Sequence, residues 1–155
     1  MAVIPARELS PPGLSYREGR ANVRNGSWNI LDVKFHRGAV VTNWWLLVVR
    51  DGFRKIQGSQ DSVEVLVKLF SAKCQSSGIA MPDEQPCLLN VELPPTHTDP
   101  TRADAVDSIR STLKNELREK DGQKPDFVLV LLEYRDNFIY PGLKVIHPHP
   151  ATNGI

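Results

Sequence analysis

The chain has 155 residues, enough for about one domain with a modest hydrophobic core. Its hydrophobic content of 41% and charged content of 24% are typical of globular proteins, which excludes a wholly disordered chain. Nineteen Lys and Arg residues against eighteen Asp and Glu residues leave a formal net charge of +1, so any anion-binding site must be local.

Cysteine usage and the N-terminal residues indicate the cellular setting. Cys74 and Cys87 fit neither a zinc ligand set nor a disulfide framework, and we interpret them as reduced thiols. The N-terminus lacks the pattern of a signal peptide, and no apolar run approaches the ~18 residues that span a bilayer. We therefore expect a soluble cytoplasmic protein with no membrane partner, no metal and no other cofactor.

The first part of the chain is poor in regular patterns. Residues 1–29 are rich in Pro, Arg, Asn and Gly and show no sustained apolar period. They predict an extended, loop-rich segment that needs another element to lie against. Residues 94–100 and 147–155 are two further stretches of this kind.

The first patterned run covers residues 40–49, which are β-branched and aromatic and are followed by Asp51 and Gly52. It predicts a buried strand. An amphipathic helix should follow, with Ser59 as a candidate N-cap, Gly78 just past its end and its apolar stripe facing the sheet. The stripe consists of Val63, Leu66, Val67, Phe70 and Cys74.

Two more strands and a second helix complete the pattern. Residues 87–91 predict a short strand, and the next helix begins with the Thr101-x-x-Asp104 pattern of a capping box. Its apolar positions are Val106, Ile109, Leu113 and Leu117. Residues 127–132 are apolar throughout and predict a central strand covered on both faces. This order predicts an α/β fold with a Rossmann-like open parallel sheet in three layers.

Ligands of open α/β sheets bind beyond the carboxyl ends of the strands, and the third strand runs directly into residues 133–144. Pro141 suits a first helical position, which predicts Tyr140 at the N-cap of a third helix and Lys144 on the same face. An aromatic ring and an ammonium at a helix start can bind a phosphate and stack on its base. On spacing alone, an ordinary amphipathic pair is the favoured alternative.

Ordered segments between residues 6 and 144 carry a family resemblance. Residues 6–12 resemble the pattern A-R-x-L-x-P-P, and residues 26–38 resemble the pattern G-x-W-(N/D)-(M/L)-x-x-x-x-F. Further anchors are Gly78-Ile79, Gln85-Pro86-Cys87, the strand at Phe127 and Tyr140-x-x-x-Lys144. Together they resemble Argonaute proteins of a fungal-like kind. The resemblance implies linker 2 over residues 1–38, a partial Mid domain over 39–146 and a divergent, disordered tail over 147–155.

The resemblance also implies a function. Argonaute Mid domains bind the 5′ end of a small guide RNA, with a tyrosine stacked on the first base and a lysine at the 5′ phosphate, which correspond to Tyr140 and Lys144. The preceding loop selects the base and corresponds to Glu133, Tyr134, Arg135, Asp136, Asn137, Phe138 and Ile139. We therefore expect a guide-RNA-binding protein of RNA silencing, with other silencing proteins as further partners. We expect no enzymatic activity, because the acidic slicer residues of the family have no counterpart.

The chain departs from the family after Lys144, where a long helix, a fourth strand, a glutamine and two more phosphate-binding lysines would follow. Pro148 and Pro150 instead end any helix near residue 146. We therefore expect a sheet incomplete at its C-terminal side and weak RNA binding. A truncated gene copy, a splice product and a gene-model error are open explanations. The alternative function is an α/β chain that binds no RNA and acts in protein interaction.

Three histidines are candidates for a metal ligand or a catalytic base. His147 and His149 lie in a Pro-broken tail without a third ligand nearby, and we interpret them as solvent-exposed rather than metal-bound. His36 has no Ser, Cys or carboxylate partner at a usable spacing and is interpreted as structural.

Overall fold

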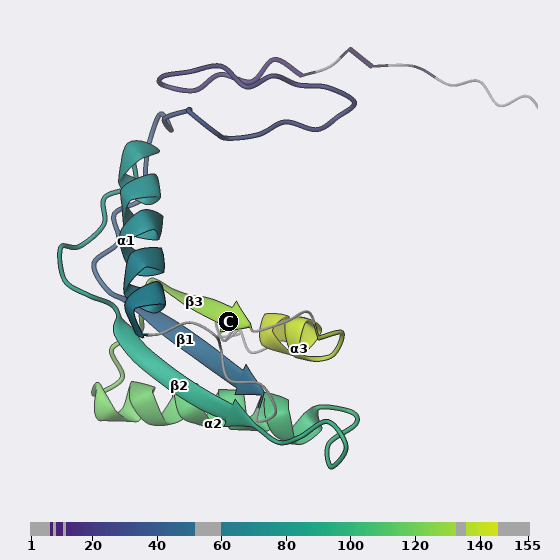
Figure 1. Ribbon diagram of the computed structural model, residues 1–155. Coiled ribbons are helices and arrows are strands. Elements are labelled where there is room, and N and C mark those ends of the chain that lie inside the picture. The colour runs from purple at the N-terminus through teal and green to yellow at the C-terminus, as the bar shows by residue number, and fades with distance from the viewer. Residues whose placement is uncertain (1–6, 8, 11, 52–59, 133–135, 146–155) are drawn as a thin grey trace, which may run out of the picture. The chain divides into compact units, whose positions relative to one another are not determined.

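The computed structural model describes residues 7, 9–10, 12–51, 60–132 and 136–145. Strands and helices alternate along them, as the sequence predicts (Figure 1). The elements are β1 (Trp44–Asp51), α1 (Gln60–Ser76), β2 (Cys87–Leu93), α2 (Ala103–Glu119), β3 (Phe127–Leu132) and α3 (Ile139–Val145). None of the described helices is long and apolar enough to cross a membrane.

The chain divides into two compact units. One comprises Met1–Val41 and Leu66–Met81, and the other comprises Thr42–Val65 and Pro82–Ile155. The sheet, α2 and α3 belong to the second unit, whereas the division falls within α1. The sequence-based boundaries at residues 38 and 146 stay predictions.

The second unit contains a parallel sheet with the strand order β2-β1-β3. Trp45 pairs with Cys87 on one side and with Val128 on the other. The predicted fold class is therefore confirmed: this is an α/β fold with an open, Rossmann-like parallel sheet. β1 begins at Trp44 rather than at Val40, which is 71% exposed and forms an isolated bridge with Ala80.

The prediction that the third strand is central was wrong. β1 lies at the centre and β3 is an edge strand whose six residues are all half-buried. Both faces of β1 are buried, since Trp44 to Val49 are each at most 3% exposed. A continuous apolar run predicts a buried strand, and both β1 and β3 have such a run. The pattern alone therefore does not show which of the two strands lies at the centre of the sheet.

One face of the sheet forms the main core of this unit. Alternate residues of β1 and β2 pack with α2 and α3, because successive side chains of a strand point to opposite faces. The buried members are Trp45, Leu47, Val49, Leu89, Val91, Leu93, Ala105, Ile109 and Ile139. The predicted stripe of α2 is confirmed, since Ile109 is fully buried and Val106, Leu113 and Leu117 pack around it. α2 therefore covers this face (Figure 1).

The helix ends follow their sequence signals only in part. Gly78 has φ +91°, and hydrogen bonds from Gly78 N to Gln75 O and from Ile79 N to Cys74 O form the Schellman cap predicted for α1. Ser59 lies outside the described residues. The capping box of α2 was wrong: its N-cap is Arg102, and the carboxylate of Asp99 accepts from Ala105 N at 2.9 Å.

The first unit contains most of the loop-rich segment. Its backbone forms an antiparallel bridge between Glu18 and Lys34, and Phe35 N donates to Ser77 O at 3.0 Å. Val33 is 3% exposed. Glu18 of the loop-rich segment thus pairs with Lys34, and Phe35, which follows the segment, contacts the residue just after α1. Val67 of α1 is buried and Leu66 is 38% exposed; the packing of this stripe on the sheet stays a prediction.

Candidate functional site

The parallel strands of the second unit all end at one edge of the sheet. β1 ends at Asp51, β2 at Leu93 and β3 at Leu132. The segments that follow β2 and β3 carry Arg102 and Asp136. The carboxyl ends of parallel strands are the usual ligand-binding edge of this fold, so the residues at this edge are candidates for a functional site.

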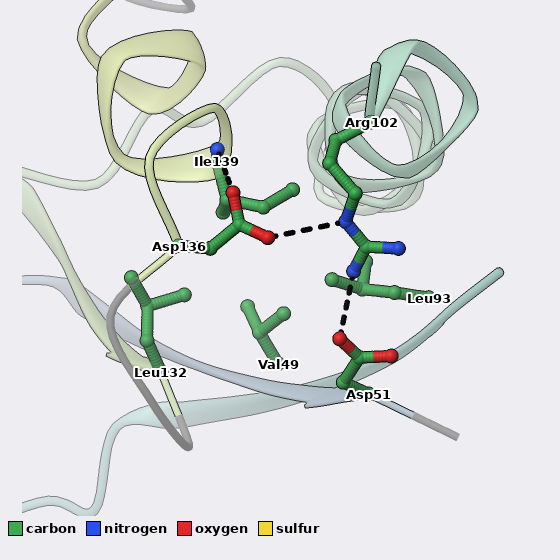
Figure 2. Close-up of a pocket in the computed structure, with 7 residues that line it drawn as sticks. All are labelled: Val49, Asp51, Leu93, Arg102, Leu132, Asp136 and Ile139. Carbon is green, nitrogen blue, oxygen red and sulfur yellow. Dashed lines mark hydrogen bonds and ion pairs between the residues drawn. The ribbon is translucent and has the colours of Figure 1, made fainter. Parts of the chain in front are cut away.

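A buried ionic cluster lies at this edge (Figure 2). The Arg102 side chain is 2% exposed, and its Nη2 lies 2.9 Å from Asp51 Oδ2. Its Nε lies 3.2 Å from Asp136 Oδ2, and its Nη1 donates to Pro94 O at 2.6 Å. One guanidinium therefore joins the end of β1, the residue after β2 and the segment before α3.

Asp136 also begins α3. Its Oδ1 accepts hydrogen bonds from Phe138 N at 2.7 Å and from Ile139 N at 2.9 Å, which is how an N-cap carboxylate satisfies free N–H groups. The prediction of an N-cap at Tyr140 was therefore wrong. The start of the helix depends on an aspartate three residues before Ile139, and Pro141 lies within the helix rather than at its first position.

Tyr140 and Lys144 lie on the outer side of α3. The tyrosine is 56% exposed, and Lys144 Nζ lies 4.6 Å from the centroid of its ring. This is a cation–π contact at an exposed site, worth about 0.5–1 kcal/mol. The predicted helical spacing is therefore present, and it joins the two side chains to each other.

A surface hollow adjoins Tyr140. It has a volume of about 470 Å³ and is lined by Leu132, Asp136, Asn137, Tyr140 and Pro141. The hollow is thus lined by apolar side chains from the end of β3 and by polar groups from the start of α3. A flat ring with a polar edge is a chemical match for such a lining.

The predicted base-specificity loop separates into inward and outward residues. Glu133, Tyr134 and Arg135 lie outside the described residues. Ile139 is 1% exposed and belongs to the core, and both carboxylate oxygens of Asp136 are engaged by Arg102 and the start of α3. Asn137 and Phe138 are exposed. Among the described loop residues, Asn137 therefore presents the accessible amide.

Two members of the site were not anticipated from the sequence. In the sequence, Asp51 only follows a predicted strand, and Arg102 is an unspecified position in the pattern Thr101-x-x-Asp104. A charged residue that directly follows an apolar strand is a weak signal, and nothing in the local pattern connects it with Arg102, which is 51 residues away.

Cys74, Cys87 and His36 are not among the residues that form this cluster. Cys74 and Cys87 are free thiols. Burial raises the pKa of Cys74, and burial together with a hydrogen bond to Glu116 raises the pKa of Cys87 to about 11. Ser15 Oγ lies 3.4 Å from His36 Nε2, a contact the sequence did not predict and longer than the ~2.6–3.2 Å of an activated pair. His147 and His149 lie outside the described residues. Among the residues described, no group of three His, Cys, Asp or Glu side chains is placed to hold a metal ion.

Comparisons with known proteins give partial matches. No family model matches the chain. Protein argonaute 5 of Arabidopsis thaliana is 33% identical over 103 residues, which cover 64% of this chain and 10% of the relative. Protein argonaute 1B of Oryza sativa subsp. japonica is 27% identical over 150 residues, which cover 94% of this chain and 12% of the relative.

Part of this chain is therefore similar to plant Argonaute proteins. It spans about a tenth of the length of these relatives. The second match covers nearly the whole chain, so the similarity includes both the loop-rich segment and the sheet. The fungal character and the assignment to a Mid domain stay predictions.

Proposed function

We propose that the chain provides a Mid-like surface that receives the 5′-terminal nucleotide of a small guide RNA in RNA silencing. The observation that carries the proposal is the pairing of Tyr140 and Lys144 beside the hollow at the carboxyl edge of the sheet. The partial similarity to Argonaute proteins supports it. The cytoplasm is the proposed location, and other silencing proteins are proposed partners.

The contact between Lys144 and Tyr140 is compatible with nucleotide binding. A charge-assisted hydrogen bond to phosphate contributes roughly 1.5–3 kcal/mol, more than the ~0.5–1 kcal/mol of an exposed cation–π contact. The ammonium therefore gains by moving from the ring to a phosphate. The ring face that it leaves is then open to a base, and stacking contributes about 1–3 kcal/mol.

These magnitudes set the expected affinity. One stacked base and one phosphate contact together scarcely exceed the ~4 kcal/mol that corresponds to millimolar binding. The binding proposed for this chain is therefore weak. We propose no enzymatic step for this chain.

The test is a titration of the full chain with nucleoside 5′-monophosphates, followed by amide chemical shifts. We expect millimolar binding, with shifts centred on residues 136–144 and weaker binding of the phosphate-free nucleoside. Tyr140→Ala and Lys144→Ala should each weaken binding by about tenfold or more, since 1.4 kcal/mol corresponds to a factor of ten. Tyr140→Phe keeps the ring and should bind as the parent chain does.

Lys114→Ala is the matched control for charge, because Lys114 is an exposed lysine of α2. It should leave the affinity unchanged, whereas Lys144→Ala should also reduce the salt dependence of binding.

A 5′-phosphorylated RNA incubated with the chain and Mg²⁺ should remain uncut. Shifts that scatter away from α3 would refute the proposal. An absence of shifts at about ten millimolar ligand would also refute it, because this concentration is about tenfold above the millimolar Kd that ~4 kcal/mol represents.

Protein interaction is the second candidate function. It is favoured by exposed apolar side chains in the first unit, where Trp28 is 47%, Ile30 49% and Leu31 61% exposed. Clusters of large apolar side chains at a surface are typical of protein contacts. A chain that fails the nucleotide titration but remains folded would support this alternative.

A further inference from the structure

Arg102 occupies an unusual position in the second unit. It is the N-cap of α2, with φ 58° and ψ 23°, a left-handed conformation that residues other than Gly, Asn and Asp adopt at a cost. It is also 1% exposed, although arginine is rarely buried without a specific partner. Strained and buried residues of this kind persist only where surrounding contacts hold them.

The partners of Arg102 come from three separate segments. Its guanidinium contacts Asp51 at the end of β1, Pro94 O just after β2 and Asp136 just before α3. Figure 2 shows the side chain reaching from α2 between Asp51 and Asp136. A planar guanidinium with several fixed donors suits such a junction, whereas a lysine ammonium on a flexible stem does not.

In the described part of the chain, the other contacts of α3 are packing contacts. The helix has seven residues, a length at which an isolated helix is not stable in water. Ile139 enters the core, Leu143 packs against it, and Gly142 lies close to Val106 of α2. Asp136 adds the N-cap bonds at one oxygen and the Arg102 contact at the other.

We propose that Arg102 is a positioning residue for α3: by holding the Asp136 carboxylate it determines where the helix presents Tyr140 and Lys144. The effect on local order stands on the contacts alone, and the effect on nucleotide binding rests on the proposed function. Arg102 does not touch the nucleotide. It acts through Asp136, whose other oxygen begins the helix.

Asp136→Asn is the decisive variant. Asparagine caps helices about as well as aspartate, so a purely capping role predicts an unchanged α3. The variant removes the charge that pairs with Arg102, so the positioning role predicts a looser helix. We expect amide hydrogen exchange in α3 to accelerate about tenfold while the amides of β1 and β2 keep their protection, and nucleoside monophosphate affinity to fall several-fold.

Two further variants complete the experiment. Arg102→Lys keeps a positive charge but cannot contact three segments at once, so it should also accelerate exchange in α3. Asp107→Asn is the matched control, because Asp107 is an exposed carboxylate of α2 paired with Arg110. It should change neither readout. If Asp136→Asn does not fold, Arg102→Lys carries the comparison.

The outcomes separate the two proposals. Exchange in α3 that is unchanged in both Asp136→Asn and Arg102→Lys would overturn the positioning role. Faster exchange in α3 in a chain whose parent form binds no nucleoside monophosphate would support the positioning role and overturn the proposed function. Faster exchange together with weaker binding would support both.

Discussion

At the residue scale, a single carboxylate holds the beginnings of two strands together. Asp126 Oδ2 accepts hydrogen bonds from Thr42 N at 2.7 Å and from Asn43 N at 3.1 Å, with the Thr42 hydroxyl at 3.2 Å. In return, Asp126 N donates to Asn43 O at 2.8 Å. Asp126 precedes β3 and Thr42 precedes β1, so these bonds set the pairing of the two strands where they begin.

The same hydrogen bonds lower the pKa of Asp126, with the backbone donors Thr42 and Asn43 as the main causes. Because the folded pKa lies below the unfolded one, which is about 3.9, the stabilisation is complete above the unfolded pKa and is lost as pH falls through the folded pKa. We expect the difference in unfolding free energy between the parent chain and Asp126→Asn to shrink from pH 6 to pH 2 in urea titrations. A difference that stays constant over this range would show that the charge has no role.

At the element scale, the contact between α3 and α2 requires a glycine. A Cβ atom at Gly142 would lie 2.6 Å from Val106 Cγ2 and 3.3 Å from Cγ1. Valine is stiff at χ1 and cannot easily move both methyl groups away. The two helices therefore pack at a distance that only glycine permits at this position.

Gly142→Ala should lower the unfolding free energy or detach α3. Overpacking costs about 1–3 kcal/mol, which is larger than the ~1 kcal/mol that alanine gains over glycine in a helix. Val106→Ala removes both methyl groups, so the double variant should recover part of the loss. The measurement is a double-mutant cycle in urea. A stabilising effect of Gly142→Ala alone would mean that α3 does not pack against α2 as described.

The helix ends show how far local signals reach. Gly78 follows α1 in a left-handed conformation, and Asp121, with φ 51°, holds the same position after α2. Such an end depends only on a few neighbouring residues. The helix starts were different. Asp99 and Asp136 took the capping roles expected of Thr101 and Tyr140, since loop geometry decided which oxygen reached the free N–H groups.

At the scale of the whole molecule, the sheet has an apolar edge strand. β3 pairs with β1 on one side, and in the part of the chain that is described no strand pairs with its other side. All six of its residues are apolar and half-buried. Exposed edges of apolar strands are sites of association between chains.

We therefore expect the isolated chain to bind hydrophobic dyes and to associate as its concentration rises, measured by dye fluorescence and sedimentation. Leu129→Lys places a charge on the edge strand and should reduce association, because charged residues block pairing at sheet edges. A monomeric chain that unfolds cooperatively and does not bind such dyes would contradict this expectation.

The sequence alone determined the order of the elements and the class of the fold. Apolar residues at helical spacing and continuous apolar runs are local properties, and five alternating segments of this kind admit few arrangements other than an open parallel sheet. The helical spacing of Tyr140 and Lys144 was likewise predictable, because residues four apart share a helix face. Their roles in nucleotide binding stay predictions.

Only the tertiary structure decided which strand lies at the centre and which loop residues face outward. β1 and β3 each contain a continuous apolar run, so their places in the sheet depend on pairing between distant segments. From the sequence, Asp136 was expected to contact a base. In the structure, Arg102 and the start of α3 engage its two carboxylate oxygens. Arg102 and Asp51 are 51 residues apart, and an interaction at that distance leaves no periodic trace in the sequence. Long-range contacts between single side chains therefore decided the geometry of the candidate site.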